Sequence, residues 1–207
     1  METDYAGKTL GKYHLKDAIG SGGMGTVYEG RHEILEQKVA VKVLSPALVM
    51  NEEAVTRFLR EGRFVAKLRH NNIITVYDLG EEDGVHYLSM EYVEGIPLTK
   101  LIEQKGPVQP LRALDITRQV ADALASAHEQ SVVHRDIKPD NIMIDQSGKV
   151  KVMDFGIAKA MDAMTELTME GTSIGTLRYM SPEQCRGLQV DHRSDIFSLG
   201  IVLFEML

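Results

Sequence analysis

The sequence predicts an α+β fold with two lobes, in which a small, mostly antiparallel sheet with one helix precedes a mainly helical lobe. Three observations indicate this fold. Short β-prone or alternating runs dominate about the first ninety residues. One amphipathic helical pattern interrupts those runs at residues 51–66. From Gly95 onward the pattern is helical, apart from one short hairpin.

Five strands are expected in the first lobe. They are Tyr13–Gly20, Thr26–His32, Lys38–Leu44, Ile73–Leu79 and Val85–Val93. The first two flank a cluster of glycines, and the last two are joined by a turn at Glu81–Gly84. In the third strand the alternation places its three valines on one face, and Ala40 and Lys42 on the other.

One helix is expected between these strands. Asn51 is a favourable N-cap, and Glu52 and Glu53 suit the positive end of the helix dipole. Glu61 falls at the border of the apolar stripe. That stripe consists of Val55, Phe58, Leu59, Gly62, Val65 and Ala66.

The second lobe begins near residues 93–95, which divides the chain into an N-terminal extension (1–12), a first lobe (13–93) and a second lobe (94–207). We expect a long helix at Leu111–Gln130 and a hairpin that joins Ile142–Ile144 to Val150–Val152. Asp162–Ser173 has no clear period and is interpreted as a loop. Ser194–Leu207 is a helix with apolar residues nearly all round, so we expect it to be buried.

Composition narrows the class of protein. With 43% hydrophobic and 26% charged residues, the chain is typical of a soluble globular protein. A formal net charge of −7 argues against a nucleic-acid-binding protein. The single cysteine, Cys185, excludes an internal disulfide and a cysteine-based metal cluster, and it favours a reducing compartment.

Neither a signal peptide nor a membrane span is expected in this chain. Met1–Asp4 contains no basic region followed by an apolar run. The longest apolar stretch, Ile196–Leu207, is shorter than the about 20 residues that a membrane helix needs. We therefore expect a cytoplasmic protein. The sequence leaves open whether a segment outside this chain carries a membrane anchor.

The glycine cluster fits the pattern G-x-G-x-x-G. Its residues are Gly20, Ser21, Gly22, Gly23, Met24 and Gly25. Glycine lets backbone N–H groups approach phosphate oxygens closely. A dinucleotide-binding fold or a plain hairpin turn would fit the pattern too. Because the β-prone run Thr26-Val27-Tyr28 follows where a dinucleotide-binding helix should open, the glycines join two strands.

Lys42 shares its strand face with Ala40 and is expected to point toward a nucleotide. A single lysine on a strand is more often a solvated edge residue. Glu61, at the inner margin of the following helix, supplies a partner. Such a pair would hold the ammonium group against the α- and β-phosphates.

The decisive stretch runs from His134 to Asn141 and reads H-R-D-I-K-P-D-N, with Asp154-Phe155-Gly156 after the expected hairpin. Both match catalytic motifs of phosphoryl transfer. That reaction needs a carboxylate near the acceptor hydroxyl, oxygen ligands for magnesium and cations for the phosphates. Asp136 supplies the carboxylate, Asn141 and Asp154 supply the oxygen ligands, and Lys42 and Lys138 supply the cations. A polar turn before a hairpin does not explain these motifs in this order.

On these motifs, the chain resembles the eukaryotic-type protein kinase superfamily from about Tyr13 to its last residue. The lysine at position 138, two residues after Asp136, resembles the residue that the serine/threonine branch carries there. The runs Gly22–Tyr28 and Ser181–Gln184 resemble bacterial members. The resemblance implies a protein-kinase-like bilobal fold, with ATP and Mg²⁺ as cofactors and Mn²⁺ as an alternative.

The resemblance also implies an adenine pocket. Met90 would be the gatekeeper, while Glu91 and Val93 would offer hinge backbone groups to the base. The residues that would sandwich the ring are Ile19, Val27, Ala40 and Met143. Asn141 and Asp154 would bind the metal.

Regulation is implied by Arg135, which resembles the receptor for a phosphate on an activation loop. That loop would span Asp154–Glu183 and offers Thr165, Thr168, Thr172 and Ser173. We favour Thr168 or Thr172, although each hydroxyl could simply be solvated. Thr176 resembles the structural threonine of the family, which bonds near Asp136 and Lys138.

Two departures from the family are visible. Ser181 replaces the alanine common in A-P-E, and the chain stops at Leu207 inside a helix that the family continues with further helices. We therefore expect a C-terminally truncated catalytic domain, whose uncovered apolar helix leads to self-association. Asp195 resembles the aspartate that braces the backbone around His134 and Arg135.

The expected activity is transfer of the ATP γ-phosphoryl group to serine or threonine hydroxyls of proteins, this protein included. One alternative is a pseudokinase that binds nucleotide without catalysis, and another is a non-catalytic fragment with an incomplete second lobe. The intact residues Lys42, Asp136, Asn141 and Asp154 argue against the pseudokinase. The sequence does not identify the protein substrates or the activating signal.

Overall fold

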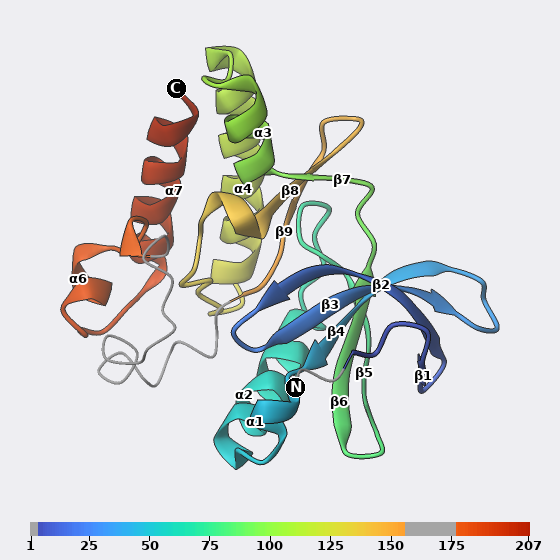
Figure 1. Cartoon of the computed structure of the whole chain (residues 1–207). Coiled ribbons are helices and arrows are strands. Elements are labelled where there is room, and N and C mark those ends of the chain that lie inside the picture. The colour runs from blue at the N-terminus through green and yellow to red at the C-terminus, as the bar shows by residue number, and fades with distance from the viewer. Residues whose placement is uncertain (1–3, 156–176) are drawn as a thin grey trace. The chain divides into compact units, whose positions relative to one another are not determined.

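The computed structural model describes residues 4–155 and 177–207 (Figure 1). These residues form two compact units. The first unit extends to Lys67 and resumes over Thr75–Tyr92, and the second comprises Leu68–Ile74 and the described residues from Val93 onward. The sequence had assigned residues 68–74 to the first lobe. The predicted α+β fold, with an antiparallel sheet before a mainly helical part, is confirmed.

The first unit contains a six-stranded antiparallel sheet with the order β1-β2-β3-β4-β6-β5. Its strands are β1 (Thr9–Leu10), β2 (Tyr13–Gly22), β3 (Gly25–His32), β4 (Lys38–Leu44), β5 (Val76–Glu82) and β6 (Val85–Glu91). β4 has the predicted bounds. β5 begins three residues later than predicted, because Ile73 bridges to Val152 and the Ile74 N–H donates to the Val152 carbonyl at 3.0 Å.

One face of this sheet carries an apolar core. Its members are Tyr5, Leu10, Tyr13, Leu15, Tyr28, Val39, Val41, Val43 and Tyr87. The three valines of β4 lie in this core, as the alternation predicted. Tyr5 and Leu10 come from the segment that the sequence assigned to an N-terminal extension, so that segment packs on the sheet. Gly11, with φ of +59°, allows a close approach, because a Cβ there would lie 2.0 Å from the Tyr87 hydroxyl oxygen.

Helices α1 (Pro46–Val49) and α2 (Glu52–Val65) follow β4 (Figure 1). Asn51 caps α2 as predicted, since its Oδ1 accepts from the Ala54 N–H at 3.0 Å. The residues that α2 buries are Ala54, Phe58, Gly62 and Val65. Glu61 lies at the margin of this face and is half-buried, in agreement with its position on the predicted stripe.

The second unit combines helices with a three-stranded antiparallel sheet of order β7-β8-β9. Its elements are β7 (Gly95–Pro97), α3 (Leu98–Lys105), α4 (Pro110–His128), the 3₁₀ helix η1 (Pro139–Asn141), β8 (Ile142–Asp145), β9 (Val150–Val152), α6 (Pro182–Cys185) and α7 (His192–Met206). The β8–β9 hairpin confirms the prediction. β7 was not predicted, because a three-residue strand that ends in proline has no β pattern of its own.

α7 packs against α4 along one side (Figure 1). The residues that it buries are Ser194, Asp195, Ser198, Leu199, Val202 and Met206. Ile196 and Phe204 remain 51% and 82% exposed, so the described residues do not enclose the helix, in agreement with the expectation that it is uncovered in this chain. Its inward face includes polar residues because they bind backbone groups: the Ser198 hydroxyl donates to the Tyr179 carbonyl at 2.7 Å. The predicted loop at residues 162–173 lies outside the described residues.

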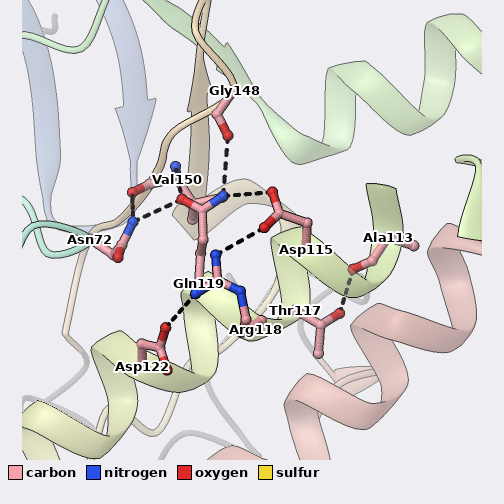
Figure 2. A network of polar contacts seen from close by, with 9 residues as sticks. All are labelled: Asn72, Ala113, Asp115, Thr117, Arg118, Gln119, Asp122, Gly148 and Val150. Carbon is pink, nitrogen blue, oxygen red and sulfur yellow. Dashed lines mark hydrogen bonds and ion pairs between the residues drawn. The ribbon is translucent and has the colours of Figure 1, made fainter. Parts of the chain in front are cut away.

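Gln119 on α4 is the centre of a polar network in the second unit (Figure 2). Its Nε2 donates to Asp115 Oδ2 at 3.0 Å and to the Gly148 carbonyl at 3.3 Å. Its Oε1 accepts from Asn72 Nδ2 and from the Val150 N–H, both at 2.9 Å. One buried side chain therefore joins α4, the β8–β9 hairpin and residues 68–74, which explains why that segment belongs to the second unit.

We predict that Gln119→Leu destabilises the protein. The substitution keeps the side-chain size but removes the partners of the Val150 N–H, the Asn72 amide and the Gly148 carbonyl. The free energy of unfolding should fall by about 1–3 kcal/mol for each group that is left buried and unsatisfied. Chemical denaturation measures this, with Gln104→Leu on the exposed surface of α3 as the control. Equal stability of the two variants would contradict a structural role for the network.

Candidate active site

The glycine-rich hairpin lies between β2 and β3, where Gly22 pairs with Gly25. A Cβ on Gly25 would lie 1.9 Å from the Val43 carbonyl oxygen, so packing within the fold requires glycine there. A Cβ on Gly20, Gly22 or Gly23 would meet nothing within 4 Å, and none of these three has a positive φ. The fold itself therefore does not require these three glycines. Close approach of a phosphate to the backbone would explain why glycine occupies these three positions.

The other nucleotide residues predicted in the first unit lie on β4 and β6. Ala40 pairs with Met90, and both side chains are buried. Lys42 is half-buried on the same face of β4 as Ala40, between Val27 of β3 and Leu88 of β6. These positions agree with the predicted strand face.

Backbone bonds hold the predicted hinge residues within their own units. The Glu91 N–H donates to the Thr75 carbonyl at 2.8 Å in the first unit. Val93 belongs to the second unit, where its carbonyl accepts from the Gly95 N–H at 2.9 Å. Met143 lies on β8 of that unit, opposite Pro97 and Lys151. Ile19 on β2 is exposed.

In the second unit, the carboxylate of Asp195 holds the backbone of the predicted catalytic loop, residues 134–141. Its Oδ2 accepts from the His134 N–H at 2.8 Å and its Oδ1 from the Arg135 N–H at 2.7 Å. The prediction that Asp195 braces this backbone is confirmed. His128, at the end of α4, binds the same carboxylate through Nε2 at 2.7 Å. Sequence analysis missed His128, because it carries no motif signal.

His134 connects the loop to the Asp154-Phe155 segment. Its Nδ1 accepts from the Asp136 N–H at 3.2 Å, and its Nε2 donates to the Met153 carbonyl at 2.9 Å. The ring also packs against Phe155, with 4.5 Å between the ring centroids. Complete burial lowers the pKa of His134. A neutral imidazole accepts one hydrogen bond and donates another, which agrees with the contacts of the two ring nitrogens.

The loop brings three predicted catalytic residues together. Lys138 Nζ lies 3.2 Å from Asp136 Oδ2. The Asn141 amide nitrogen donates to that same oxygen at 3.1 Å and to the Asp136 carbonyl at 2.8 Å. Lys138 and the Asn141 amide thus both hold the Asp136 carboxylate. This carboxylate can orient a hydroxyl group and accept its proton.

Asn141 and Asp154 fit a divalent metal ion. The Met153 N–H donates to the Asn141 carbonyl at 2.9 Å, which brings the residue before Asp154 beside Asn141. The Asn141 amide nitrogen is directed at Asp136, so the side-chain oxygen is the atom that can face a metal. Among residues 4–155 and 177–207, no group of three His, Cys, Asp or Glu side chains could hold a metal by itself. Two oxygen ligands would suit a divalent ion that prefers oxygen.

Arg135 has a left-handed backbone with φ of +67°. Its Nε is buried and has no hydrogen-bond partner among the described residues. Burial lowers the pKa of the guanidinium. The regulatory candidates Thr165, Thr168, Thr172, Ser173 and Thr176, like Gly156, lie outside the described residues.

A profile of the protein kinase domain matches residues 13–207. The chain belongs to this family. It is 47% identical over 197 residues to the serine/threonine-protein kinase PrkC of Bacillus subtilis, covering 95% of this chain and 30% of PrkC. It is 44% identical over 200 residues to the serine/threonine-protein kinase PknB of Mycobacterium leprae, covering 95% of this chain and 32% of PknB. The predicted resemblance to bacterial serine/threonine kinases is confirmed.

A solved structure agrees with these sequence matches. The crystal structure of the PknI kinase domain from Mycobacterium tuberculosis superposes with a TM-score of 0.77 and 32% identity, covering 99% of this chain and 76% of that chain. Membership of the kinase family implies the use of ATP and a divalent metal. The chain spans only about a third of the length of the curated relatives that it matches. In the described part of the chain, no helix is long and apolar enough to cross a membrane.

The two kinds of glycine in the hairpin should respond differently to substitution. Gly22→Ala should leave stability within about 0.5 kcal/mol, because its Cβ meets no atom, but it should weaken ATP binding. Gly25→Ala should cost about 1–3 kcal/mol, since its Cβ would overlap the Val43 carbonyl. Denaturation curves and calorimetric titration with ATP measure both effects. An unaltered ATP affinity in Gly22→Ala would contradict a nucleotide role for this glycine.

Proposed function

We propose that this protein is a serine/threonine protein kinase that transfers the γ-phosphoryl group of ATP to hydroxyl groups of protein substrates, itself included. The observation that carries the proposal is the Asp136 carboxylate, which Lys138 and Asn141 hold in a loop fixed by Asp195. A carboxylate and a lysine at this spacing suit an acceptor hydroxyl and a transferring phosphoryl group.

The roles of the catalytic residues follow from this arrangement. Asp136 orients the acceptor hydroxyl and takes its proton as the new P–O bond forms. Lys138, 3.2 Å from Asp136, steadies the transferring phosphoryl group. Asn141 and Asp154 would hold Mg²⁺, or Mn²⁺ as an alternative. A divalent ion there supplies neutralising charge to the phosphates.

The first unit supplies most of the proposed nucleotide site. Lys42, which is proposed to pair with Glu61, positions the α- and β-phosphates, and the backbone of the glycine hairpin covers them. Met90 is the gatekeeper, with Glu91 and Val93 as the backbone contacts of adenine. The side chains proposed to enclose the ring are Ile19, Val27, Ala40 and Met143. The burial of Ala40 and Met90 supports an apolar environment for the base.

The pseudokinase alternative has no observation in its favour. Such proteins typically lack one of the residues that catalysis requires. Here Lys42, Asp136, Asn141 and Asp154 are all present, and Asp136 contacts both Lys138 and Asn141.

We predict that Asp136→Asn lowers phosphoryl transfer by about 10²–10⁴-fold, the usual value of positioned proton transfer. ATP binding should persist, because Asp136 faces the acceptor rather than the nucleotide. Lys42→Met should lower both transfer and ATP affinity. Transfer of labelled phosphate from ATP to the protein itself and to a serine-containing acceptor measures the first effect. Near-native turnover in Asp136→Asn would show that the assignment is wrong.

Arg135 is proposed to receive a phosphate group on Thr168 or Thr172, with Thr168 favoured. The buried Arg135 Nε, which lacks a hydrogen-bond partner among the described residues, supports this role. A guanidinium binds phosphate through paired, charge-assisted hydrogen bonds. Thr176 is proposed to bind near Asp136 and Lys138.

Incubation with Mg²⁺ and ATP should therefore add phosphate between Thr165 and Ser173. Because each phosphate adds about −1.5 to −2 charge, it should raise activity in the native protein and have less effect in Arg135→Gln. Mass spectrometry combined with initial-rate measurements tests this prediction. Absence of phosphate from the whole interval would contradict it.

Self-association is a further part of the proposal. The exposed apolar side chains of α7, Ile196, Phe197 and Phe204, support it, because soluble monomers rarely leave such a group uncovered.

A further inference from the structure

A single side chain, that of Gln184, connects helix α6 to the catalytic loop. At the start of α6, the Ser181 N–H donates to Gln184 Oε1 at 3.0 Å, and the Gln184 N–H donates to Ser181 Oγ at 3.3 Å. These two bonds form a capping box. The Nε2 of Gln184 then donates to the Arg135 carbonyl at 2.8 Å.

The capping box alone does not require a glutamine. Glutamate serves equally well at this position of the motif, since only an acceptor oxygen is needed. The amide donor is what distinguishes glutamine, and here that donor is directed at the backbone of Arg135. The choice of residue therefore indicates a contact outside the helix.

The acceptor of this bond lies at a decisive place in the loop. The acceptor is the Arg135 carbonyl, which belongs to the peptide that joins Arg135 to Asp136. The N–H of that same peptide donates to His134 Nδ1 at 3.2 Å. Arg135 has a left-handed φ of +67°. A non-glycine residue in that conformation costs roughly 1–2 kcal/mol and persists only where its surroundings fix it.

The helix that carries Gln184 is anchored on its other side. Ser181 is completely buried, and Glu183 Oε1 accepts a hydrogen bond from the Ser194 hydroxyl of α7. That bond lowers the pKa of Glu183. Helix α6 therefore holds the Gln184 amide group in place, and the position of this group constrains the loop.

We propose that Gln184 is a positioning residue for phosphoryl transfer. Its amide group fixes the plane of the Arg135–Asp136 peptide and thereby directs the Asp136 carboxylate toward the acceptor hydroxyl. This proposal rests on the proposed kinase activity and adds a residue to which none of the catalytic motifs assigns a role.

The test is Gln184→Glu in the full-length protein. The substitution keeps the acceptor oxygen for the Ser181 N–H but places a carboxylate oxygen against the Arg135 carbonyl. Turnover (kcat) should fall about tenfold, the equivalent of one hydrogen bond of about 1.4 kcal/mol. The KM for ATP and the melting temperature should change little, because nucleotide residues and the capping box are left intact.

The matched control is Gln130→Glu. Gln130 also donates to a backbone carbonyl, that of Ser126 at 3.3 Å, but at an exposed helix end where water can replace it. This variant should keep native turnover. Equal turnover in the two variants would overturn the proposal.

A pH profile separates positioning from a purely structural role. The ionisable groups on the elements that meet here are His134, Arg135, Asp136 and Lys138 of the loop, Glu183 and Cys185 of α6, and His192, Arg193, Asp195 and Glu205 of α7. Lowering the pH protonates the introduced carboxyl group, which restores a donor for the Arg135 carbonyl. The kcat ratio of Gln184→Glu to the native protein should therefore rise as the pH falls. A ratio that stays constant, or a loss of activity that follows a loss of stability, would overturn the proposal.

Failure of the kinase activity itself would be recognised separately. If the native protein transfers no phosphate, the proposed function fails. Hydrogen exchange of the Arg135 and Asp136 amides still tests the contact, and it should be faster in Gln184→Glu than in Gln130→Glu. Equal exchange rates in the two variants would contradict the proposed positioning contact as well.

Discussion

The second unit depends on one buried carboxylate, that of Asp195, which is 1% exposed. An ionised group at that depth is stable only if donors surround it. Two successive backbone N–H groups and His128 supply them. Because both N–H groups belong to the catalytic loop, the compensation of this charge also fixes the direction of the loop backbone. The ring of His134 and the peptide before Asp136 are placed as a consequence.

The same requirement explains the unusual polarity of α7. A helix of this composition would normally bury its aliphatic and aromatic residues and expose its serines. Here Ser194, Asp195 and Ser198 are buried, since each binds a group on a neighbouring segment. Large apolar residues such as Phe204 lie on the exposed side of the helix in this chain. The inward side of this helix therefore combines these polar contacts with the burial of Leu199, Val202 and Met206.

Within the candidate site, the proposed catalytic side chains contact one another. Asp136 contacts both Lys138 and Asn141, and the His134 ring is held between the Asp136 N–H and the Met153 carbonyl. Groups that are already oriented need little reorganisation when charge develops during a reaction. The left-handed conformations of Arg135 and Asp154 agree with this view, since strained backbone is concentrated at functional sites.

The sequence by itself determined the features that local pattern encodes. Alternation fixed the faces of β4, and the N-cap at Asn51 fixed the start of α2, because neighbouring residues alone control periodicity and capping. The motif around Asp136 identified the family and the residue types of the site, since that chemistry allows few alternatives. Tertiary structure alone decided the contacts of Gln119, His128 and Gln184. Their partners lie 47, 67 and 49 residues away in the chain, and no local pattern specifies which distant backbone group or carboxylate a buried polar side chain will meet.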